Sequence, residues 1–197
     1  MATGARTHRV HDAAGYLLHS AAWKETSLVI HVFTREHGNV ALVAKGAKRP
    51  YSVLRPVLNV FQPLTLSWSG AGEIKTLVRA ECAGIRPLAG RALMSAWYMN
   101  ELLLRLLPRE DPHDNLYDAY DAALRRLAQG SSAAGALRRF EWTLLHETGY
   151  GLDEAEPDFD DPAAEPGLRV SLRQRLDDLL AGRPLRTRKV LMALQRF

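Results

Sequence analysis

Hydrophobic and polar residues alternate through much of the first 84 residues, in short runs separated by turn-forming residues. Such alternation is typical of strands with one buried face. The runs predict five strands, at Ala14–Ser20, Leu28–Phe33, Val40–Lys45, Phe61–Trp68 and Ile74–Cys82. Five antiparallel strands joined by short turns and one long connection predict a small closed barrel. An OB-fold is a common solution of this kind, and an SH3-like barrel is the alternative.

The period of the pattern changes near Arg91 to that of amphipathic helices. Five helices are predicted, at Ala92–Leu107, from about Pro112 to Gly130, and at Ala133–Glu147, Leu172–Ala181 and Leu185–Gln195. The strand and helix patterns meet near Gly84–Gly90, where two glycines and Pro87 interrupt both. The expected fold class is therefore α+β, with a five-stranded OB-fold β-barrel over residues 1–84 followed by an α-helical domain over residues 85–197.

Residues 153–167 interrupt the helical pattern with seven acidic residues, no basic residue and three prolines. This composition predicts a flexible acidic linker within the helical domain. A second hypothesis is that the segment mimics a polyanion and competes for a basic groove of the same chain.

The net charge of +4 is unevenly distributed, because residues 1–84 carry +5 and residues 168–197 carry +6. Basic regions suit a polyanion such as nucleic acid, although they also serve solubility alone. The single cysteine, Cys82, excludes an intrachain disulfide and a multi-cysteine zinc site. The N-terminus has no apolar leader, and the longest apolar helix pattern is too short to span a membrane. We therefore expect a soluble, cytoplasmic protein with no membrane contact.

No motif in the sequence predicts catalysis. Gly70–Thr76 has the glycines and the Lys-Thr pair of a phosphate loop, but its spacing is wrong and a strand follows it. The seven histidines show no metal-binding spacing, and no serine lies in a nucleophile elbow. We expect a protein that is not an enzyme and uses no metal or cofactor.

The long connection between the third and fourth predicted strands is the main candidate for binding. It combines basic side chains with one aromatic ring: Lys45, Lys48, Arg49, Tyr51 and Arg55. Basic groups neutralise phosphates and aromatic rings stack on bases, so the loop predicts a nucleic-acid contact. Trp23 and Lys24 precede the second strand and extend this set. Secondary contacts are predicted at Arg35, Lys75 and Arg79, with the last two on one face because their separation is even.

Arg138 and Arg139 are adjacent in the third predicted helix, so their side chains point about 100° apart. One interpretation is pairing on the helix surface, for instance between Arg138 and Glu141. The other is an anion site beside an apolar pocket, suited to a peptide with an acidic and hydrophobic tip.

Several motifs, in order along the chain, resemble the RecO family of bacterial recombination mediators. They are Gly15–Ser20, Glu25–Leu28, Val43–Ala47, Phe61–Leu64, Glu73–Leu77, Tyr98–Leu103, Ala136–Glu141, Gly149–Gly151 and Gly182–Arg188. The resemblance covers about residues 14–152 and 182–195.

This resemblance implies an N-terminal OB domain, binding of single- and double-stranded DNA, and annealing of complementary strands. It also implies partnership with RecR and with the acidic C-terminal tail of single-strand DNA-binding protein (SSB), so that RecA loads on SSB-coated DNA. A nucleoid-associated location follows. Arg138 corresponds to an arginine of the family's tail-binding pocket, and Arg139 is its neighbour.

The chain departs from the family pattern in two places. It lacks the four-cysteine zinc module of some RecO proteins, and the region between Gly151 and the final helix is shortened. A different class of function stays open, namely an OB-fold adaptor that binds RNA or an acidic peptide or protein rather than DNA.

Overall fold

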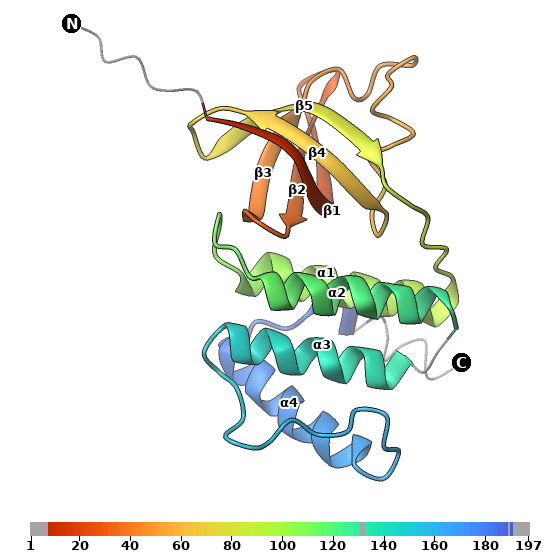
Figure 1. The fold of residues 1–197 in the computed structure, drawn as a ribbon, viewed down its shortest axis with the longest axis vertical. Helices are drawn as coiled ribbons and strands as arrows, with labels where there is room; N and C mark the ends of the chain where they lie inside the picture. Colours follow the sequence, from red (N-terminus) through yellow and green to blue (C-terminus); the bar gives the residue numbers. More distant parts are fainter. Residues whose placement is uncertain (1–7, 131–132, 189, 191–197) are drawn as a thin grey trace, which may run out of the picture. The chain divides into compact units, whose positions relative to one another are not determined.

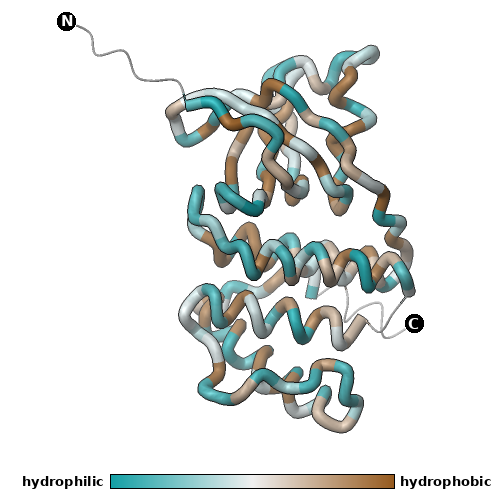
Figure 2. The backbone as a smooth tube through the Cα atoms, in the orientation of Figure 1, coloured by the Kyte–Doolittle hydropathy of each residue, from teal (hydrophilic) through white to brown (hydrophobic). Residues whose placement is uncertain are grey.

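A computed structural model describes residues 8–130, 133–188 and 190 of the chain (Figure 1). The chain divides into two compact units. The barrel unit comprises residues up to Arg86 together with Pro108–Pro112, and the helical unit comprises Pro87–Leu107 and the residues from His113 onward. Figure 2 shows hydrophobic and hydrophilic residues interspersed along the strands and helices, as the sequence pattern requires.

The barrel unit contains five strands, which confirms the predicted fold class. They are β1 (Arg9–Trp23), β2 (Ser27–Thr34), β3 (Gly38–Ala44), β4 (Pro63–Ser69) and β5 (Ile74–Cys82). The sheet closes in the order β1-β2-β3-β5-β4. The expectation that all strands are antiparallel is wrong for one pair, because β3 and β5 run parallel. Parallel strands need a crossover connection, and here the long loop and β4 supply it.

Strand β1 is longer than predicted because it takes part in two ladders. Its first half pairs with β4 and its second half with β2. Gly15 lies where the ladders meet, opposite both Thr34 and Leu64. A Cβ atom at Gly15 would lie 3.0 Å from the Leu66 side chain and 3.1 Å from the Phe33 carbonyl oxygen. Glycine at this position therefore allows the strand to turn from one neighbour to the other.

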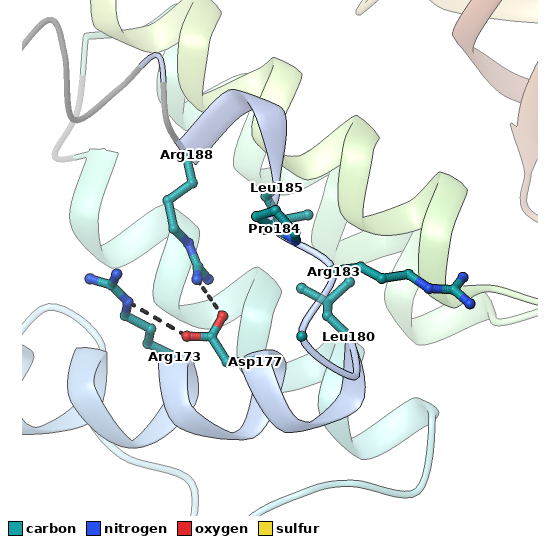
Figure 3. Close-up of a pocket in the computed structure, with 8 residues that line it drawn as sticks. Arg173, Asp177, Leu180, Arg183, Pro184, Leu185 and Arg188 are labelled. Carbon is teal, nitrogen blue, oxygen red and sulfur yellow. Dashed lines mark hydrogen bonds and ion pairs between the residues drawn. The ribbon is translucent and has the colours of Figure 1, made fainter.

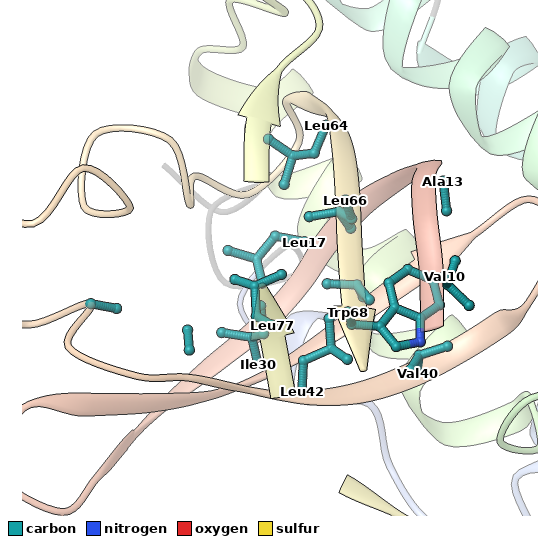
Figure 4. Packing of buried hydrophobic residues seen from close by; sticks show 13 residues of the cluster. Val10, Ala13, Leu17, Ile30, Val40, Leu42, Leu64, Leu66, Trp68 and Leu77 are labelled. Atoms are coloured by element: carbon teal, nitrogen blue, oxygen red, sulfur yellow. The ribbon is translucent and has the colours of Figure 1, made fainter. Parts of the chain in front are cut away.

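Inward-facing side chains of all five strands form the hydrophobic core of the barrel (Figure 4). Trp68 is its largest member and is 2% exposed. Leu17, Ile30, Leu42, Leu64 and Leu66 surround the barrel interior and are almost fully buried. This core fixes the strand ends, and with them the loops that carry charge.

Residues Pro108–Pro112, although they connect two helices in sequence, pack within the barrel unit. The Glu110 backbone N–H donates to the Asn39 carbonyl oxygen at 3.1 Å. Gly38 has φ of +63°, and a Cβ atom there would overlap the Asp111 backbone. Glycine is required at this turn on both counts.

The helical unit contains α1 (Gly90–Leu106), α2 (Asp114–Ala128), α3 (Ala133–Glu147) and α4 (Glu165–Leu179). The first three agree closely with the predicted ranges. Helix α4 begins at Glu165, seven residues before the predicted start, so the last residues of the supposed acidic linker are helical. Pro166 suits the first turn of a helix, where its missing N–H is not needed. Most of the fifth predicted helix, Leu185–Gln195, lies outside the described residues.

None of the helices in the described residues combines the length and the apolar character that crossing a membrane requires. The same residues contain no group of three or more histidine, cysteine, aspartate or glutamate side chains arranged to hold a metal ion.

Candidate functional sites

The long connection between β3 and β4 is an ordered loop with apolar anchors. Consecutive turns run along it, with backbone hydrogen bonds from Arg49 to Gly46, from Ser52 to Arg49 and from Arg55 to Ser52. Four of its side chains pack against the barrel core, namely Leu54, Val57, Leu58 and Val60. The apolar residues of the loop thus hold it to the barrel, which leaves its charged residues facing solvent.

All four basic residues of this loop are exposed: Lys45, Lys48, Arg49 and Arg55. In the described part of the chain, none of the four charged groups has a hydrogen-bond or ion-pair partner. Tyr51 lies among them and is 99% exposed. The structure therefore brings five of the eight predicted DNA-binding residues together, which we call the basic loop (Lys45–Arg55).

The turn between β1 and β2 lies beside the basic loop. The Lys48 backbone N–H donates to the Thr26 carbonyl oxygen at 2.9 Å. Trp23, at the end of β1, is 47% exposed, and Lys24 is exposed in the turn that follows. A second aromatic ring and a fifth cation therefore lie near the residues predicted to bind DNA.

Arg79 does not share a face with Lys75, contrary to the prediction. The ladder between β4 and β5 shifts register, because Ser67 lies opposite Arg79 and Trp68 lies opposite Leu77. Val78 is the extra residue and is 66% exposed. A bulge of this kind reverses the inward and outward alternation beyond it. Arg79 consequently points to solvent, where it forms an ion pair with Glu81 at 2.6 Å.

Lys75 is buried rather than presented to solvent, which argues against its predicted role in binding phosphate. Its ammonium group forms an ion pair with Glu110 and donates to the Gly72 carbonyl oxygen at 3.3 Å. Only 9% of its side chain is exposed. Arg35 lies at the turn between β2 and β3, is half-buried, and donates its backbone N–H to Ala14. Neither residue belongs to the basic loop.

The helical unit contains a cavity of about 560 Å³. Its apolar lining includes Met94 and Leu137. Five arginines from four segments also line it: Arg91, Arg138, Arg169, Arg173 and Arg188. Only two acidic residues, Glu141 and Glu165, do so. We call it the arginine-lined cavity, and its charge and shape suit an anionic ligand with an apolar part.

Arg138 and Glu141 form a buried ion pair in the wall of this cavity. Their side chains are 9% and 3% exposed, and Arg138 Nη2 donates to Glu141 Oε1 at 3.2 Å. The Tyr98 hydroxyl donates to the same oxygen at 2.6 Å. Burial raises the pKa of Glu141, and this effect outweighs the positive charge of Arg138, which lowers it. Burial, together with the Glu141 charge, raises the pKa of Tyr98 well above its usual value.

Arg138 Nε and Glu141 Oε2 lie 3.2 Å apart, but among the described residues neither atom has an aligned hydrogen-bond partner. Buried polar groups in this state gain from a ligand that completes their hydrogen bonds. Arg138 does pair with Glu141, as one interpretation of the sequence expected, but the pair is buried in the cavity wall rather than on the helix surface. Arg138 Nε and Glu141 Oε2 can therefore still form hydrogen bonds with a ligand in the cavity.

Arg139 does not line the arginine-lined cavity, so the two adjacent arginines serve different surfaces. Its guanidinium carbon lies 4.7 Å from the centroid of the Phe159 ring. It also forms a long ion pair with Glu156, at 3.8 Å. Phe159 belongs to the acidic segment, which is therefore in contact with α3.

A smaller cavity of about 280 Å³ lies beside the end of α4 (Figure 3). Arg173 and Arg188 both point to Asp177, which forms ion pairs with each of them. Asp177 therefore neutralises part of the charge that these two arginines bring to the larger cavity. The sequence prediction missed Arg91, Arg169, Arg173 and Arg188, although the basic excess after residue 168 was a signal for the last three.

Comparison with protein families identifies the chain. The family described as Recombination protein O N terminal matches residues 9–86, and Recombination protein O C terminal matches residues 88–156. A protein named DNA repair protein RecO from Ralstonia nicotianae is 43% identical over 236 aligned positions, which include 96% of this chain and 87% of that protein. The chain belongs to the RecO family.

Other RecO proteins match over a shorter stretch. DNA repair protein RecO from Cupriavidus pinatubonensis is 57% identical over 145 residues, which are 73% of this chain and 50% of that protein. The protein of the same name from Aromatoleum aromaticum is also 57% identical over 145 residues, or 60% of its length. The chain thus spans about half to three-fifths of the length of these RecO relatives.

Proposed function

We propose that this RecO-family chain is a non-catalytic mediator of DNA repair and recombination. It binds single- and double-stranded DNA, anneals complementary strands and, with RecR, helps to load RecA on single-stranded DNA coated with SSB. Membership of a family whose curated members are named DNA repair proteins supports a role in DNA repair. The observation that carries DNA binding is the basic loop, with a fully exposed tyrosine among four cations that have no partner within the residues the structure describes.

The chemistry of the basic loop fits a flexible nucleic-acid strand. Lysine and arginine side chains without internal partners release counterions from phosphates when they bind. Tyr51 in the loop and Trp23 at the end of β1 are both exposed and offer rings on which bases stack, with a contribution of about 1–3 kcal/mol for each base. Stacking of this kind depends little on sequence, which suits a protein that brings together any two complementary strands.

The combined substitution of Lys48→Ala and Arg49→Ala tests this proposal. Single-strand DNA affinity should fall, and the slope of log K against log salt should flatten by about 1.4, since each neutralised phosphate contributes about 0.7. Fluorescence anisotropy of a labelled oligonucleotide across a salt titration measures both quantities. Arg125→Ala is the matched control and should leave both quantities unchanged, because Arg125 is an exposed arginine of α2 that pairs with Asp121 and is not a predicted DNA contact.

An unchanged slope in the double variant would contradict the assignment of the basic loop. RNA bound as tightly as DNA, with no annealing of complementary oligonucleotides, would favour the alternative of an adaptor protein instead.

We further propose that the arginine-lined cavity receives the acidic C-terminal tail of SSB. The five arginines and the apolar wall support this proposal, because such a tail combines carboxylates with hydrophobic side chains. Arg138 supports the cavity wall through Glu141, whereas Arg169 is exposed at its edge. Both the Arg138→Ala and the Arg169→Ala variant should bind an acidic tail peptide more weakly and retain DNA binding. Undiminished peptide affinity in the Arg169 variant would place the site elsewhere.

A further inference from the structure

The acidic segment between α3 and α4 contains one buried side chain, Phe159. Among residues 152–164, all other side chains are exposed or half-buried, whereas Phe159 is 3% exposed. Its ring lies edge-on to Trp142, with centroids 6.1 Å apart, and beneath the guanidinium of Arg139. A single aromatic ring is therefore inserted between a cation and a second ring on α3.

The carboxylate next to this ring binds a different helix. Arg126 of α2 donates two hydrogen bonds to Asp160, with Nη1 3.2 Å from Oδ2 and Nη2 bound to Oδ1. The hydrogen bond from Arg126 lowers the pKa of the Asp160 carboxyl group, which keeps it ionised. The ring and the carboxylate thus engage two arginines, one from each helix. We call the surface formed by Arg126, Gly135, Arg139 and Trp142 the α2–α3 groove.

Gly135 has no side chain and therefore lets the backbone of the acidic segment lie close to α3. A Cβ atom at this position would lie 2.8 Å from the Phe159 carbonyl oxygen and 2.7 Å from Asp160 Oδ1. Any larger residue would therefore push the segment away from α3. The absence of a side chain at Gly135 therefore lets the main chain of the segment, and not only the Phe159 ring, approach α3 closely.

The segment also holds its own turn without help from the helices. The Asp160 backbone N–H donates to Asp158 Oδ1 at 2.9 Å, and the Ala163 backbone N–H donates to Asp161 Oδ1 at 2.9 Å. Pro157 and Pro162 flank the turn and restrict the chain further. A segment that is ordered before it docks loses less entropy on docking.

The residues of the α2–α3 groove match the RecO C-terminal family, whereas the ring and the carboxylate that bind there lie just beyond the matched residues. The groove residues lie within residues 88–156, which match the RecO C-terminal family, whereas Phe159 and Asp160 lie beyond that match. The surface that receives the ring is thus part of the region shared with the family. The ring that occupies it lies just beyond the end of that match, at residue 159.

We propose that the α2–α3 groove is a binding site for acidic peptides with a central aromatic residue, and that Asp158–Asp161 occupies it as a ligand within the same chain. The contacts support exchange, because the solvent-exposed ion pairs Arg126–Asp160 and Arg139–Glu156 contribute little, which leaves the single Phe159 ring as the main anchor of the segment. A tethered segment acts at an effective concentration of about millimolar. A free peptide of the same chemistry must therefore displace it, and binds weakly until it is removed.

The test uses the full chain and a fluorescent peptide with the sequence of residues 156–162. The double variant with Phe159→Ala and Asp160→Asn vacates the groove, and it should bind this peptide at least tenfold more tightly than the unaltered chain. Adding Arg139→Ala to the vacated variant should abolish the gain. A peptide with alanine in place of its phenylalanine is the matched control and should bind neither protein.

Equal peptide affinity in the vacated and unaltered chains would overturn the proposal, and so would equal binding of the control peptide. Circular dichroism verifies that the vacated variant is folded. The single variant Asp160→Asn, which keeps the buried ring, provides a second measurement, because it should show a smaller gain of the same sign. Arg169→Ala should leave the gain intact, so failure of the cavity proposal is distinguishable from failure of this one.

Discussion

Lys75 is a buried cation whose only charged partner among the described residues is Glu110. Removing that partner leaves an ammonium group with 9% of its side chain exposed and no compensating charge. We expect Glu110→Gln to destabilise the barrel unit by about 1–3 kcal/mol, the usual cost of an unsatisfied buried group. Urea unfolding followed by tryptophan fluorescence measures the change.

Glu73→Gln is the control for this substitution. Glu73 is 88% exposed and its ion pair with Arg109 is long, at 3.4 Å, so its loss should change stability by less than about 0.5 kcal/mol. Equal stability of the Glu110 variant and the unaltered chain would contradict the structural role given to Lys75.

At the scale of single residues, the sequence predicted which charged residues lie in an exposed loop better than it predicted which way the side chains of a strand point. The exposure of each basic residue in the basic loop was predicted, because charged side chains in a connection between two strands lie at the surface. Lys75 and Arg79 were placed on one face because a regular strand alternates, and the bulge at Val78 breaks that alternation. The docking of Glu110 on the barrel is a long-range contact, which local patterns do not encode.

Glu101 connects α1 to the start of the segment that follows α4. Its carboxylate accepts hydrogen bonds from the Arg186 and Thr187 backbone N–H groups, each at 2.9 Å, and pairs with Arg105 at 2.6 Å. Burial alone favours the neutral acid, but these hydrogen bonds and the Arg105 charge outweigh it and lower the pKa of Glu101. The ionised form therefore stabilises the folded helical unit.

The sign of the pH dependence follows from this lowered pKa. The contribution of Glu101 is complete above the usual glutamate pKa of about 4.5 and is lost as the pH falls through the lower folded-state value. Glu101→Gln should cost about 1–2 kcal/mol at pH 7, and its difference from the unaltered chain should shrink toward pH 3. Urea unfolding followed by helical circular dichroism at both pH values measures this. A difference that is the same at pH 7 and pH 3 would contradict the assignment.

At the scale of elements, periodicity predicted all five strands and the first three helices, because each has one buried face. Three features needed the structure. The parallel pairing of β3 with β5 depends on ring closure, and the early start of α4 depends on Pro166 at its first turn. The docking of the acidic segment depends on Phe159, one apolar residue among carboxylates, where composition alone predicts a flexible linker.

At the scale of the whole molecule, the basic loop and the arginine-lined cavity belong to different units. The basic loop lies in the barrel unit, and the arginine-lined cavity lies in the helical unit. They share no residue. Charge makes the same division, because the basic excess of residues 1–84 and that of residues 168–197 are separated by the acidic segment. The physical expectation is that each unit binds its own polyanion or acidic partner independently.

Independent binding by the two units predicts that substitutions in them have additive effects on affinity. Combining Lys48→Ala and Arg49→Ala with Arg169→Ala should give losses of DNA and peptide affinity that equal the sums of the separate losses within about 0.5 kcal/mol. A saturating concentration of peptide should likewise leave the DNA affinity of the unaltered chain unchanged. Because linkage is reciprocal, DNA should then leave the peptide affinity unchanged as well. Fluorescence anisotropy with both ligands measures the full cycle. A coupling above about 1 kcal/mol would mean that DNA and peptide bias a common equilibrium, and that a partner's acidic tail regulates DNA release as well as recruitment.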